Sequence, residues 1–388
     1  MANVDGYLDE YGGVSFCDEP FGEGDNVVLS KLAYMPLELV VSRDLTAEPV
    51  PYPEAAQAIY EYYGCKYVPL GLMIGEDVSM MTRRLASTVR FGEMKVVGCI
   101  GIDEAHPAVQ FGVQTYLLPD GTIAVVYRGT NDSLFGWKED LDILAKKAIP
   151  SHKLAVDYLE AVAKQFDGEI IVCGHSKGGH VALYAALNVS DAVRARIKNV
   201  YNNDGPGFWD YRYLYTPAYA ELLPKYKHYI PQTSLVGLML AHDDDYEVIR
   251  SDKKLGPSQH DLTSWQFEYD RLERTQLTKL GILTDLVMRS FVEKLRPEEL
   301  ASVEQLVDAV IDATGQSGLL GLSQNAKTSF ERAVDVWRAT EKPAKALVRS
   351  AFRGTGRIVF KAAGSVLRYG AAAIEKVGAT AAAVAEAL

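Results

Sequence analysis

In the middle of this chain, short apolar stretches alternate with segments whose apolar residues have helical spacing. This pattern predicts alternating strands and helices. Short stretches rich in apolar residues indicate strands at residues 111–118, 122–127 and 169–173, and we expect another strand at 198–202. Another apolar run, at 234–241, is a candidate fifth strand. Apolar residues spaced three and four apart predict helices at 152–166 and 177–187. Strands that alternate with helices favour an α/β fold, with a mostly parallel sheet and helices on both faces.

The two ends of the chain have a different pattern. Residues 1–95 predict an irregular, partly helical lead-in, because three closely spaced prolines at 49–53 interrupt any regular element there. After about Trp265 the apolar spacing is almost wholly helical. We therefore expect the lead-in to pack on an α/β domain at 96–315, and an amphipathic helical extension to follow at 316–388.

Composition and charge argue against several classes of protein. The 388 residues carry a net charge of −11, which disfavours nucleic acid as a partner. The four cysteines form no CxxC pair, so neither a zinc site nor a disulfide framework is indicated, and we expect no metal and no cofactor. The first residues lack the basic and apolar stretches of a signal peptide, and no apolar run approaches the roughly 20 residues of a spanning helix. A cytoplasmic protein is therefore expected.

The strongest chemical signal is Gly-His-Ser-Lys-Gly at 174–178, between a predicted apolar strand and a predicted helix of small residues. Glycines two before and two after a serine allow the sharp turn called a nucleophile elbow, which lifts the hydroxyl above the sheet. Ser176 is therefore the candidate nucleophile. The backbone N–H of Lys177 would point at the oxyanion, and Thr130, after the strand at 122–127, offers a second donor through its N–H or its hydroxyl. On this interpretation Lys177→Leu retains activity on neutral esters, and the Lys177 charge favours anionic substrates.

A nucleophilic serine needs a histidine base and an acid that orients it, in the chain order Ser, acid, His. Asp204 is the preferred acid, because it follows the strand at 198–202 and should emerge at the sheet edge beside Ser176. The run of three aspartates at 243–245 is more typical of a solvated turn, and Asp245 is the alternative acid.

His260 is the preferred base, because it lies in a loop late in the sheet region, before a predicted helix. His242, next to the three aspartates, is the rival. We expect His180 to pack inside the elbow helix and His228 to lie in a lysine-flanked surface stretch.

Three of these stretches, in this order, resemble the class 3 lipases: Tyr-Arg-Gly-Thr at 127–130, Trp-Lys-Glu-Asp-Leu at 137–141 and Gly-His-Ser-Lys-Gly-Gly at 174–179. The chain resembles more closely a bacterial family of unknown function in the same α/β-hydrolase superfamily. That second resemblance also includes Asn-Asp-Gly-Pro-Gly-Phe at 203–208 and Gln-His-Asp at 259–261.

The resemblance covers about residues 5–315, including Asp-Asn-Val-Val-Leu-Ser at 25–30. It implies the α/β-hydrolase fold and a lipase-like or esterase activity, for which we favour lipid or lysophospholipid-like esters. The class 3 lipases place the acid one strand later than Asp204, which keeps Asp245 open. They usually have Leu where this chain has Lys177, and only residues 131–136 are available for a lid, so bulky triglycerides are poor candidates.

Four apolar or aromatic residues are candidates for substrate binding, since ligand pockets are mostly apolar. They are Leu134, Phe135, Phe208 and Trp209. The aromatic-rich segment after Asp204 fits a packed excursion between strands equally well. The alternative function is a non-catalytic α/β-hydrolase-like protein that binds a lipid or a partner.

The C-terminal extension carries a charge opposite to that of the whole chain. Ten basic and four acidic residues lie between 331 and 378, a local net charge of +6. Basic residues recur every four positions from Lys345 to Lys361, opposite an apolar face, which is typical of a helix lying on an anionic membrane. The same face could instead pack on the acidic domain.

Overall fold

The computed structural model describes most of the chain as far as residue 294 and shorter stretches beyond it. The described residues are 3–64, 67–71, 74–104, 108–131, 133–145, 148–208, 211–242, 245–254, 256–294, 302, 305–306, 309–310, 312–314 and 325–346. Most of the extension expected at 316–388 therefore lies outside them.

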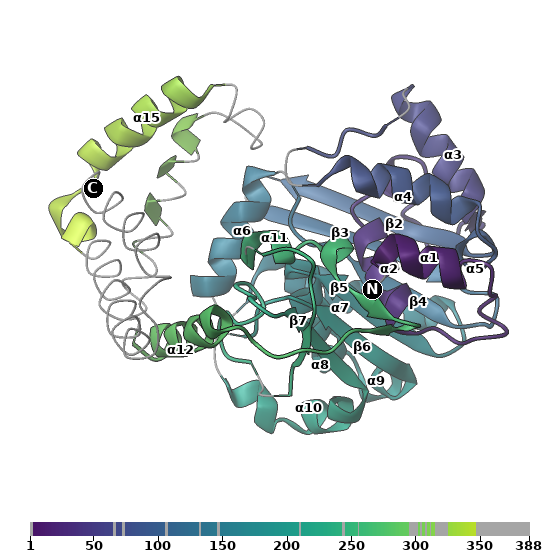
Figure 1. Ribbon diagram of the computed structural model, residues 1–388. Helices are drawn as coiled ribbons and strands as arrows, with labels where there is room; N and C mark the ends of the chain where they lie inside the picture. The colour runs from purple at the N-terminus through teal and green to yellow at the C-terminus, as the bar shows by residue number, and fades with distance from the viewer. Residues whose placement is uncertain are drawn as a thin grey trace.

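Eight strands form one sheet, in which they lie side by side in chain order (Figure 1). They are β1 (Val50–Pro51), β2 (Lys95–Glu104), β3 (Val109–Leu117), β4 (Ile123–Tyr127), β5 (Ile170–His175), β6 (Ile197–Asn203), β7 (Tyr226–Pro231) and β8 (Glu247–Ile249). β1 to β4 pair antiparallel, and β4 to β8 pair parallel. The parallel strands all end at the same edge of the sheet, so the loops that follow them converge there.

The central strands are buried on both faces, which makes this an α/β fold. On one face, the odd-numbered residues of β4 and the even-numbered residues of β5 share a core with α7 (Pro150–Gln165) and α8 (Lys177–Asn188). Their alternate neighbours share a second core with α1 (Val4–Tyr11), α2 (Glu23–Leu32) and α3 (Tyr52–Tyr63). Burial of both faces explains why these strands are continuous apolar runs in the sequence.

The N-terminal segment is more regular than the sequence suggested. It also contains α4 (Glu76–Ala86) and α5 (Val89–Gly92), and its helices cover one face of the sheet. A buried ion pair joins two of its helices, since Arg90 donates to both carboxylate oxygens of Asp25, at 2.6 and 2.7 Å.

The four predicted central strands and the two predicted helices are confirmed, but the predicted strand at 234–241 is wrong. This segment forms turns, in which the Gly237 N–H bonds to the Asp204 carboxylate instead of to a neighbouring strand. The strand in this region is β7, where His228 is 2% exposed. The prediction that His228 lies on the surface is therefore also wrong. The neighbouring lysines had suggested an exposed stretch, although the segment is a buried strand.

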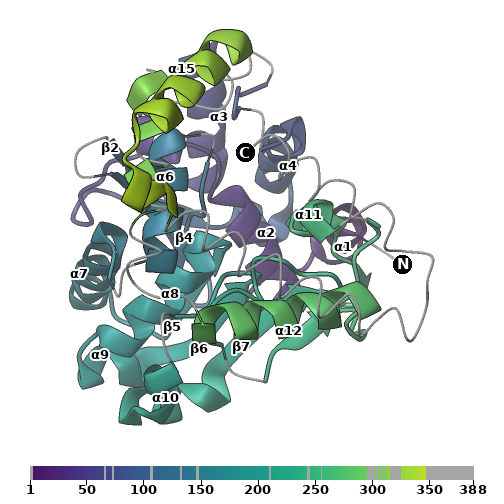
Figure 2. The same ribbon diagram turned by 90° about the vertical axis from the view of Figure 1, so that its left-hand side faces the viewer.

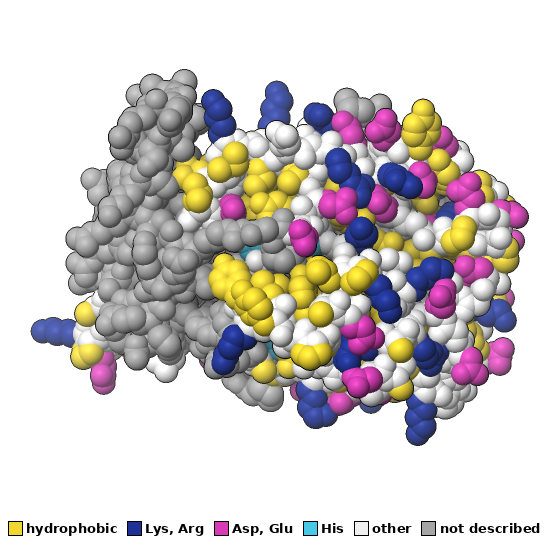
Figure 3. Space-filling view, turned by 90° about the horizontal axis from the view of Figure 1, so that it is seen from below, with side chains coloured by type: hydrophobic (Ala, Val, Ile, Leu, Met, Phe, Trp, Pro, Cys, Tyr) yellow, Lys and Arg dark blue, Asp and Glu magenta, His cyan; other side chains and the backbone are white. Residues whose placement is uncertain are grey.

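Of the remaining helices, α10 (Pro217–Leu222) packs on α8 rather than at a sheet edge. α6 (Leu134–Ala145) and α12 (Lys279–Lys294) precede α15 (Ala326–Ala339), and Figure 2 shows α12 and α15 at opposite ends of one side of the molecule. None of the helices in the described part of the chain is long and apolar enough to cross a bilayer. Hydrophobic side chains gather on the face seen in Figure 3, and three exposed ones are recorded among the side chains of α12 that the structure describes. These are Leu280, Ile282 and Leu286.

Candidate active site

Ser176 occupies the sharp turn between β5 and α8. Its backbone has φ +57° and ψ −131°, a conformation that residues with a side chain rarely adopt. The flanking glycines make the turn possible. A Cβ on Gly174 would lie 2.3 Å from the Gly178 carbonyl oxygen, and a Cβ on Gly178 would lie 2.2 Å from the Tyr127 carbonyl oxygen. The local sequence therefore produces the elbow geometry, with the Ser176 side chain half-buried at the sheet edge.

His260 lies at this elbow and contacts Asp204. The His260 Nδ1 is 2.6 Å from Asp204 Oδ2, and the His260 ring centroid is 4.4 Å from that of His175, the residue before Ser176. A carboxylate accepts hydrogen bonds, so Nδ1 carries the proton, and Nε2 of the neutral ring is left as an acceptor. Asp204 is 1% exposed, whereas a quarter of the His260 side chain is exposed. The structure thus brings a buried acid, an accessible histidine and the elbow serine to one edge of the sheet.

The Ser176 hydroxyl itself makes no hydrogen bond within the described residues. Hydrogen bonds to a catalytic nucleophile often form or tighten only in the complex with substrate, so this geometry is compatible with a base at His260.

The Asp204 carboxylate is held by a turn that sequence reasoning assigned to a strand. Its Oδ1 accepts hydrogen bonds from the Ser234 hydroxyl and, at 3.0 Å, from the Gly237 N–H. The Asp204 backbone has φ +51°. Asp245, the alternative acid, is an exposed residue, and the carboxylate on His260 Nδ1 is that of Asp204. The role of Ser234, which follows β7, was missed by the sequence reasoning.

The rival histidines are engaged elsewhere. The His242 Nε2 is 3.5 Å from Asp285 of α12, and its Nδ1 is 3.0 Å from the Leu240 carbonyl oxygen. His180 is buried in α8, as expected, with its Nε2 2.8 Å from Nε2 of His152.

Two backbone N–H groups are available as oxyanion donors. Lys177 is the first residue of α8, where N–H groups have no partner within the helix. Thr130 follows Gly129, whose Cβ, if it had one, would lie 3.1 Å from Ser176 Cβ, so the loop after β4 lies directly beside Ser176. The Thr130 hydroxyl lies 2.8 Å from both oxygens of Asp140. The sequence suggested either the hydroxyl or the backbone N–H of Thr130 as a donor. Because the hydroxyl bonds to Asp140, the N–H is the candidate donor to a ligand.

Asp140 belongs to the Trp-x-x-Asp-Leu stretch but received no role from the sequence. Burial raises its pKa, against the opposing effects of the Lys177 ammonium and the Thr130 hydrogen bond. A carboxylate in this environment holds the Thr130 loop in place through the hydroxyl.

The Lys177 side chain does not face a substrate, which corrects the sequence interpretation of its charge. Its Nζ lies 2.7 Å from Glu139 Oε2 and 2.7 Å from the Gln110 carbonyl oxygen. The Lys177 side chain is 2% exposed and that of Glu139 is fully buried. Glu139 also accepts from the hydroxyl and the N–H of Ser151, at the start of α7. The pair therefore joins β3, α6, α7 and α8 beneath the elbow.

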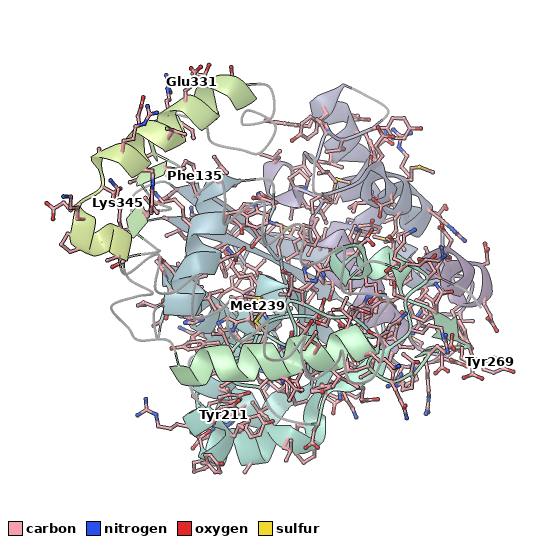
Figure 4. The ribbon with its side chains drawn as sticks, turned by 60° about the vertical axis from the view of Figure 1, so that its left-hand side comes forward. Phe135, Tyr211, Met239, Tyr269, Glu331 and Lys345 are labelled. Carbon is pink, nitrogen blue, oxygen red and sulfur yellow. The ribbon has the colours of Figure 1, made fainter. Side chains whose placement is uncertain are left out.

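The apolar candidates lie near the site but differ in exposure. Phe208 is half-buried, and its ring centroid is 4.8 Å from that of His180 and 4.6 Å from that of Tyr213. Leu134 is buried and Phe135 half-buried at the start of α6. Figure 4 shows Phe135 at the end of α6 nearer to α15. Trp209 lies outside the described residues. Phe208 and Phe135 thus remain the accessible apolar candidates.

Within the same described ranges, no three histidine, cysteine or acidic side chains are grouped in a way that could hold a metal ion.

Comparison with known proteins yields one match. A family model described as Mbeg1-like matches residues 85–311. This range contains β2 to β8 and every candidate residue of the site, and it excludes α1, α2 and α3. No curated protein and no solved structure matches the chain.

Proposed function

Because the chain belongs to the Mbeg1-like family, a lipase-like family, we propose that it is a serine hydrolase of the α/β-hydrolase fold that cleaves acyl esters. One observation carries the proposal beyond the family. Ser176 has a strained backbone at a strand-to-helix turn, beside a histidine whose Nδ1 is 2.6 Å from a buried carboxylate. A structural turn has no need of that strain or of a histidine hydrogen-bonded to a buried carboxylate, whereas a nucleophile has a use for both.

In the proposed reaction, the Ser176 hydroxyl attacks the ester carbonyl carbon while its proton passes to His260 Nε2. The backbone N–H groups of Lys177 and Thr130 stabilise the oxyanion of the tetrahedral intermediate. The C–O bond to the alcohol then breaks, and the alcohol leaves with the proton from His260. Water attacks the acyl-enzyme with His260 again as the base, which releases the acid and restores Ser176. Asp204 stabilises the imidazolium in each half-reaction.

The surroundings of Ser176 favour an uncharged acyl group. The ammonium next to the nucleophile is buried against Glu139. Phe208, whose ring packs beside that of His180 in α8, and Phe135, at the start of α6, offer half-buried aromatic surface. Esters of lipids or lysophospholipid-like molecules have such an apolar acyl chain and are the proposed substrate class.

Labelling with a fluorophosphonate tests the mechanism, because only an activated serine reacts. We expect the folded protein to be labelled, and Ser176→Ala to lose both the label and the hydrolysis of short p-nitrophenyl esters. Ser190→Ala is a matched control, since Ser190 is exposed at the start of α9 (Asp191–Arg196) and should leave both unchanged. Full activity of a folded Ser176→Ala protein would refute the serine mechanism. Absence of labelling in the folded wild type would favour the non-catalytic binding protein.

We also propose that residues 331–378 contact an anionic membrane surface. Only 331–346 of this segment are described. Figure 4 shows the labelled Glu331 and Lys345 on the side of the molecule that carries α15. Of the basic residues described there, Arg332 donates to the carbonyls of Ala313 and Thr314, so part of the charge is already used internally. Co-sedimentation should show binding to anionic but not zwitterionic vesicles, weakened by salt, and no binding by the intact chain at low salt would contradict it.

A further inference from the structure

We propose that α2 and the turn after it position the three chain segments that carry Ser176, Asp204 and His260. The inference rests on the proposed function for its catalytic meaning. α2 lies on the sheet against β4, β5 and β6 (Figure 1) and outside the part of the chain that the family model matches. Besides its apolar residues, it buries four polar ones, of which Asp25 pairs with Arg90 and Tyr7 inside the N-terminal segment. The other three, together with a tyrosine in the turn that follows, carry the inference. These are Asn26, Ser30, Lys31 and Tyr34.

The first contact holds the ends of β5 and β6. The side chains of Asn26 and Asn203 donate to each other, at 2.8 and 2.9 Å, and the Asn203 amide also donates to Ser30 at 3.0 Å. The same amide nitrogen lies 3.0 Å from the Gly174 carbonyl oxygen, so its two N–H groups are shared among three acceptors, while the Asn203 carbonyl accepts from the Ser176 N–H. Asn203 directly precedes Asp204, so this cluster sets the nucleophile strand and the acid strand in register.

The second contact holds the loop that carries the base. Lys31, 5% exposed, places its Nζ 2.6 Å from Oδ1 of Asp261, the residue after His260, and 3.3 Å from Asp77. Burial tends to raise the pKa of Asp261, but the Lys31 ammonium and hydrogen bonds from Lys31 and Thr263 outweigh burial and lower it. The ion pair therefore persists at neutral pH.

The third contact reaches the backbone of His260 itself through His175. The His175 Nε2 lies 2.7 Å from the His260 carbonyl oxygen, and its Nδ1 lies 2.7 Å from the Tyr34 hydroxyl. A carbonyl only accepts, so Nε2 carries a proton. Burial lowers the pKa of His175 well below its usual value, which leaves the ring neutral and Nδ1 as an acceptor. The Tyr34 hydroxyl is therefore the donor, and one oriented chain runs from Tyr34 through His175 to the main chain of His260.

Tyr34 also borders the oxyanion loop. A Cβ on Gly129 would lie 2.3 Å from the Tyr34 hydroxyl oxygen. Glycine at this position therefore lets the hydroxyl approach the segment that presents Thr130. Buried polar groups destabilise a fold unless they are paired, so the partners of such groups show what an element holds in place. Each of these four polar side chains pairs with a site segment.

Removal of a single hydroxyl tests the inference. In Tyr34→Phe the chain to His260 loses its donor, and misplacement of a catalytic group by a fraction of an ångström to 1 Å can cost up to about 100-fold in rate. We expect kcat on p-nitrophenyl esters to fall about 10- to 100-fold, with KM within about twofold of wild type. Tyr52→Phe is the matched control, because Tyr52 is a fully buried tyrosine whose hydroxyl donates to Thr82, away from the site.

Proton NMR gives a readout that does not depend on activity. The proton between His260 Nδ1 and Asp204 should give a strongly downfield resonance, assigned by its absence in His260→Ala. We expect Tyr34→Phe to broaden or shift it at an unchanged melting temperature, and Tyr52→Phe to leave it intact. An unchanged resonance in folded Tyr34→Phe would overturn the positioning role. If the wild type proves to have no hydrolase activity, the proposed function fails, while this resonance still decides the inference.

Variants of Lys31 provide a second line of evidence should Tyr34→Phe fail to fold. Lys31→Met removes the ion pair with Asp261 and should perturb the same resonance and lower kcat. Lys31→Arg keeps the charge and the donor and should restore both. Equal behaviour of Lys31→Met and wild type in the NMR spectrum would overturn the inference.

Discussion

Loss of the Lys177 ammonium should destabilise the protein severely, although the residue lies next to the nucleophile. In Lys177→Met the Glu139 carboxylate keeps three neutral donors: the Gln110 N–H at 3.1 Å, and the N–H and hydroxyl of Ser151 at 3.1 and 2.6 Å. It loses the Lys177 ammonium, its only positively charged contact among the described residues. Removal of one partner from a buried ion pair costs about 3–5 kcal/mol. That is a large part of the roughly 5–15 kcal/mol by which a domain is stable.

Removal of both charges should be much less harmful than removal of one. In the double variant Lys177→Met/Glu139→Gln no charge is left buried, and such replacements are often neutral within about 1–2 kcal/mol. Lys198→Met is the surface control, because Lys198 and Glu169 form a similar 2.7 Å pair with side chains 39% and 63% exposed. An exposed pair contributes about 0–1 kcal/mol.

Urea unfolding at pH 7 and 25 °C measures all three variants. We expect the free energy of unfolding to fall by about 3–5 kcal/mol in Lys177→Met and to recover by most of that amount in the double variant. The Lys177 N–H remains in place, so the folded fraction of Lys177→Met should still hydrolyse neutral esters. A single variant within about 1 kcal/mol of wild type, or a double variant as unstable as the single one, would refute this reasoning.

The other predictions concern stability at low pH and the choice between two candidate catalytic carboxylates. Three buried histidines have lowered pKa values, mainly through burial: His152, His175 and His180, the last at about 4. They are neutral in the folded protein but protonate near pH 6.5 when unfolded, so their contribution is complete above about pH 6.5 and is lost as the pH falls. At pH 5 each histidine should lower the free energy of unfolding by about 2 kcal/mol, roughly 6 kcal/mol for the three together. Equal urea midpoints at pH 7.5 and pH 5 would contradict this prediction. Asp204→Asn should lower kcat by orders of magnitude and Ser234→Ala by about tenfold, whereas Asp245→Asn should have little effect, and a crippled Asp245→Asn enzyme would reverse the choice of acid.

The sequence predicted best those elements whose signal is local. β4 and β5 are buried along their whole length and appear as continuous apolar runs. β7 was not predicted, because Lys225 directly before it and Lys227 within it gave the segment the composition of an exposed stretch. The segment at 234–241 was mistaken for a strand, because its apolar residues pack around a turn whose N–H groups bond to Asp204. Hydrophobicity alone cannot distinguish these two uses of an apolar run.

The candidate site divides in the same way. The elbow around Ser176 is a local motif, and the chain order of the strands then points to Asp204 and His260. The supporting contacts join residues far apart in the chain: 38 positions separate Glu139 from Lys177, and 141 separate Tyr34 from His175. No periodicity or spacing predicts such pairs from one sequence. The signal that was present is composition, since Asn, Ser and Lys interrupt the apolar residues of α2 and therefore require partners.

Backbone strain gives an argument for function that is independent of any motif. Among the described residues other than glycine, four have a positive φ, and two of these are the candidate nucleophile and the candidate acid. Such conformations cost about 1–3 kcal/mol each and persist only where the surroundings enforce them. Here the Ser176 N–H bonds to the Asn203 carbonyl and the Asp204 N–H to the Tyr229 carbonyl. Adjacent strands thus hold both strained residues at the same sheet edge, which supports the proposal that this edge carries the reaction.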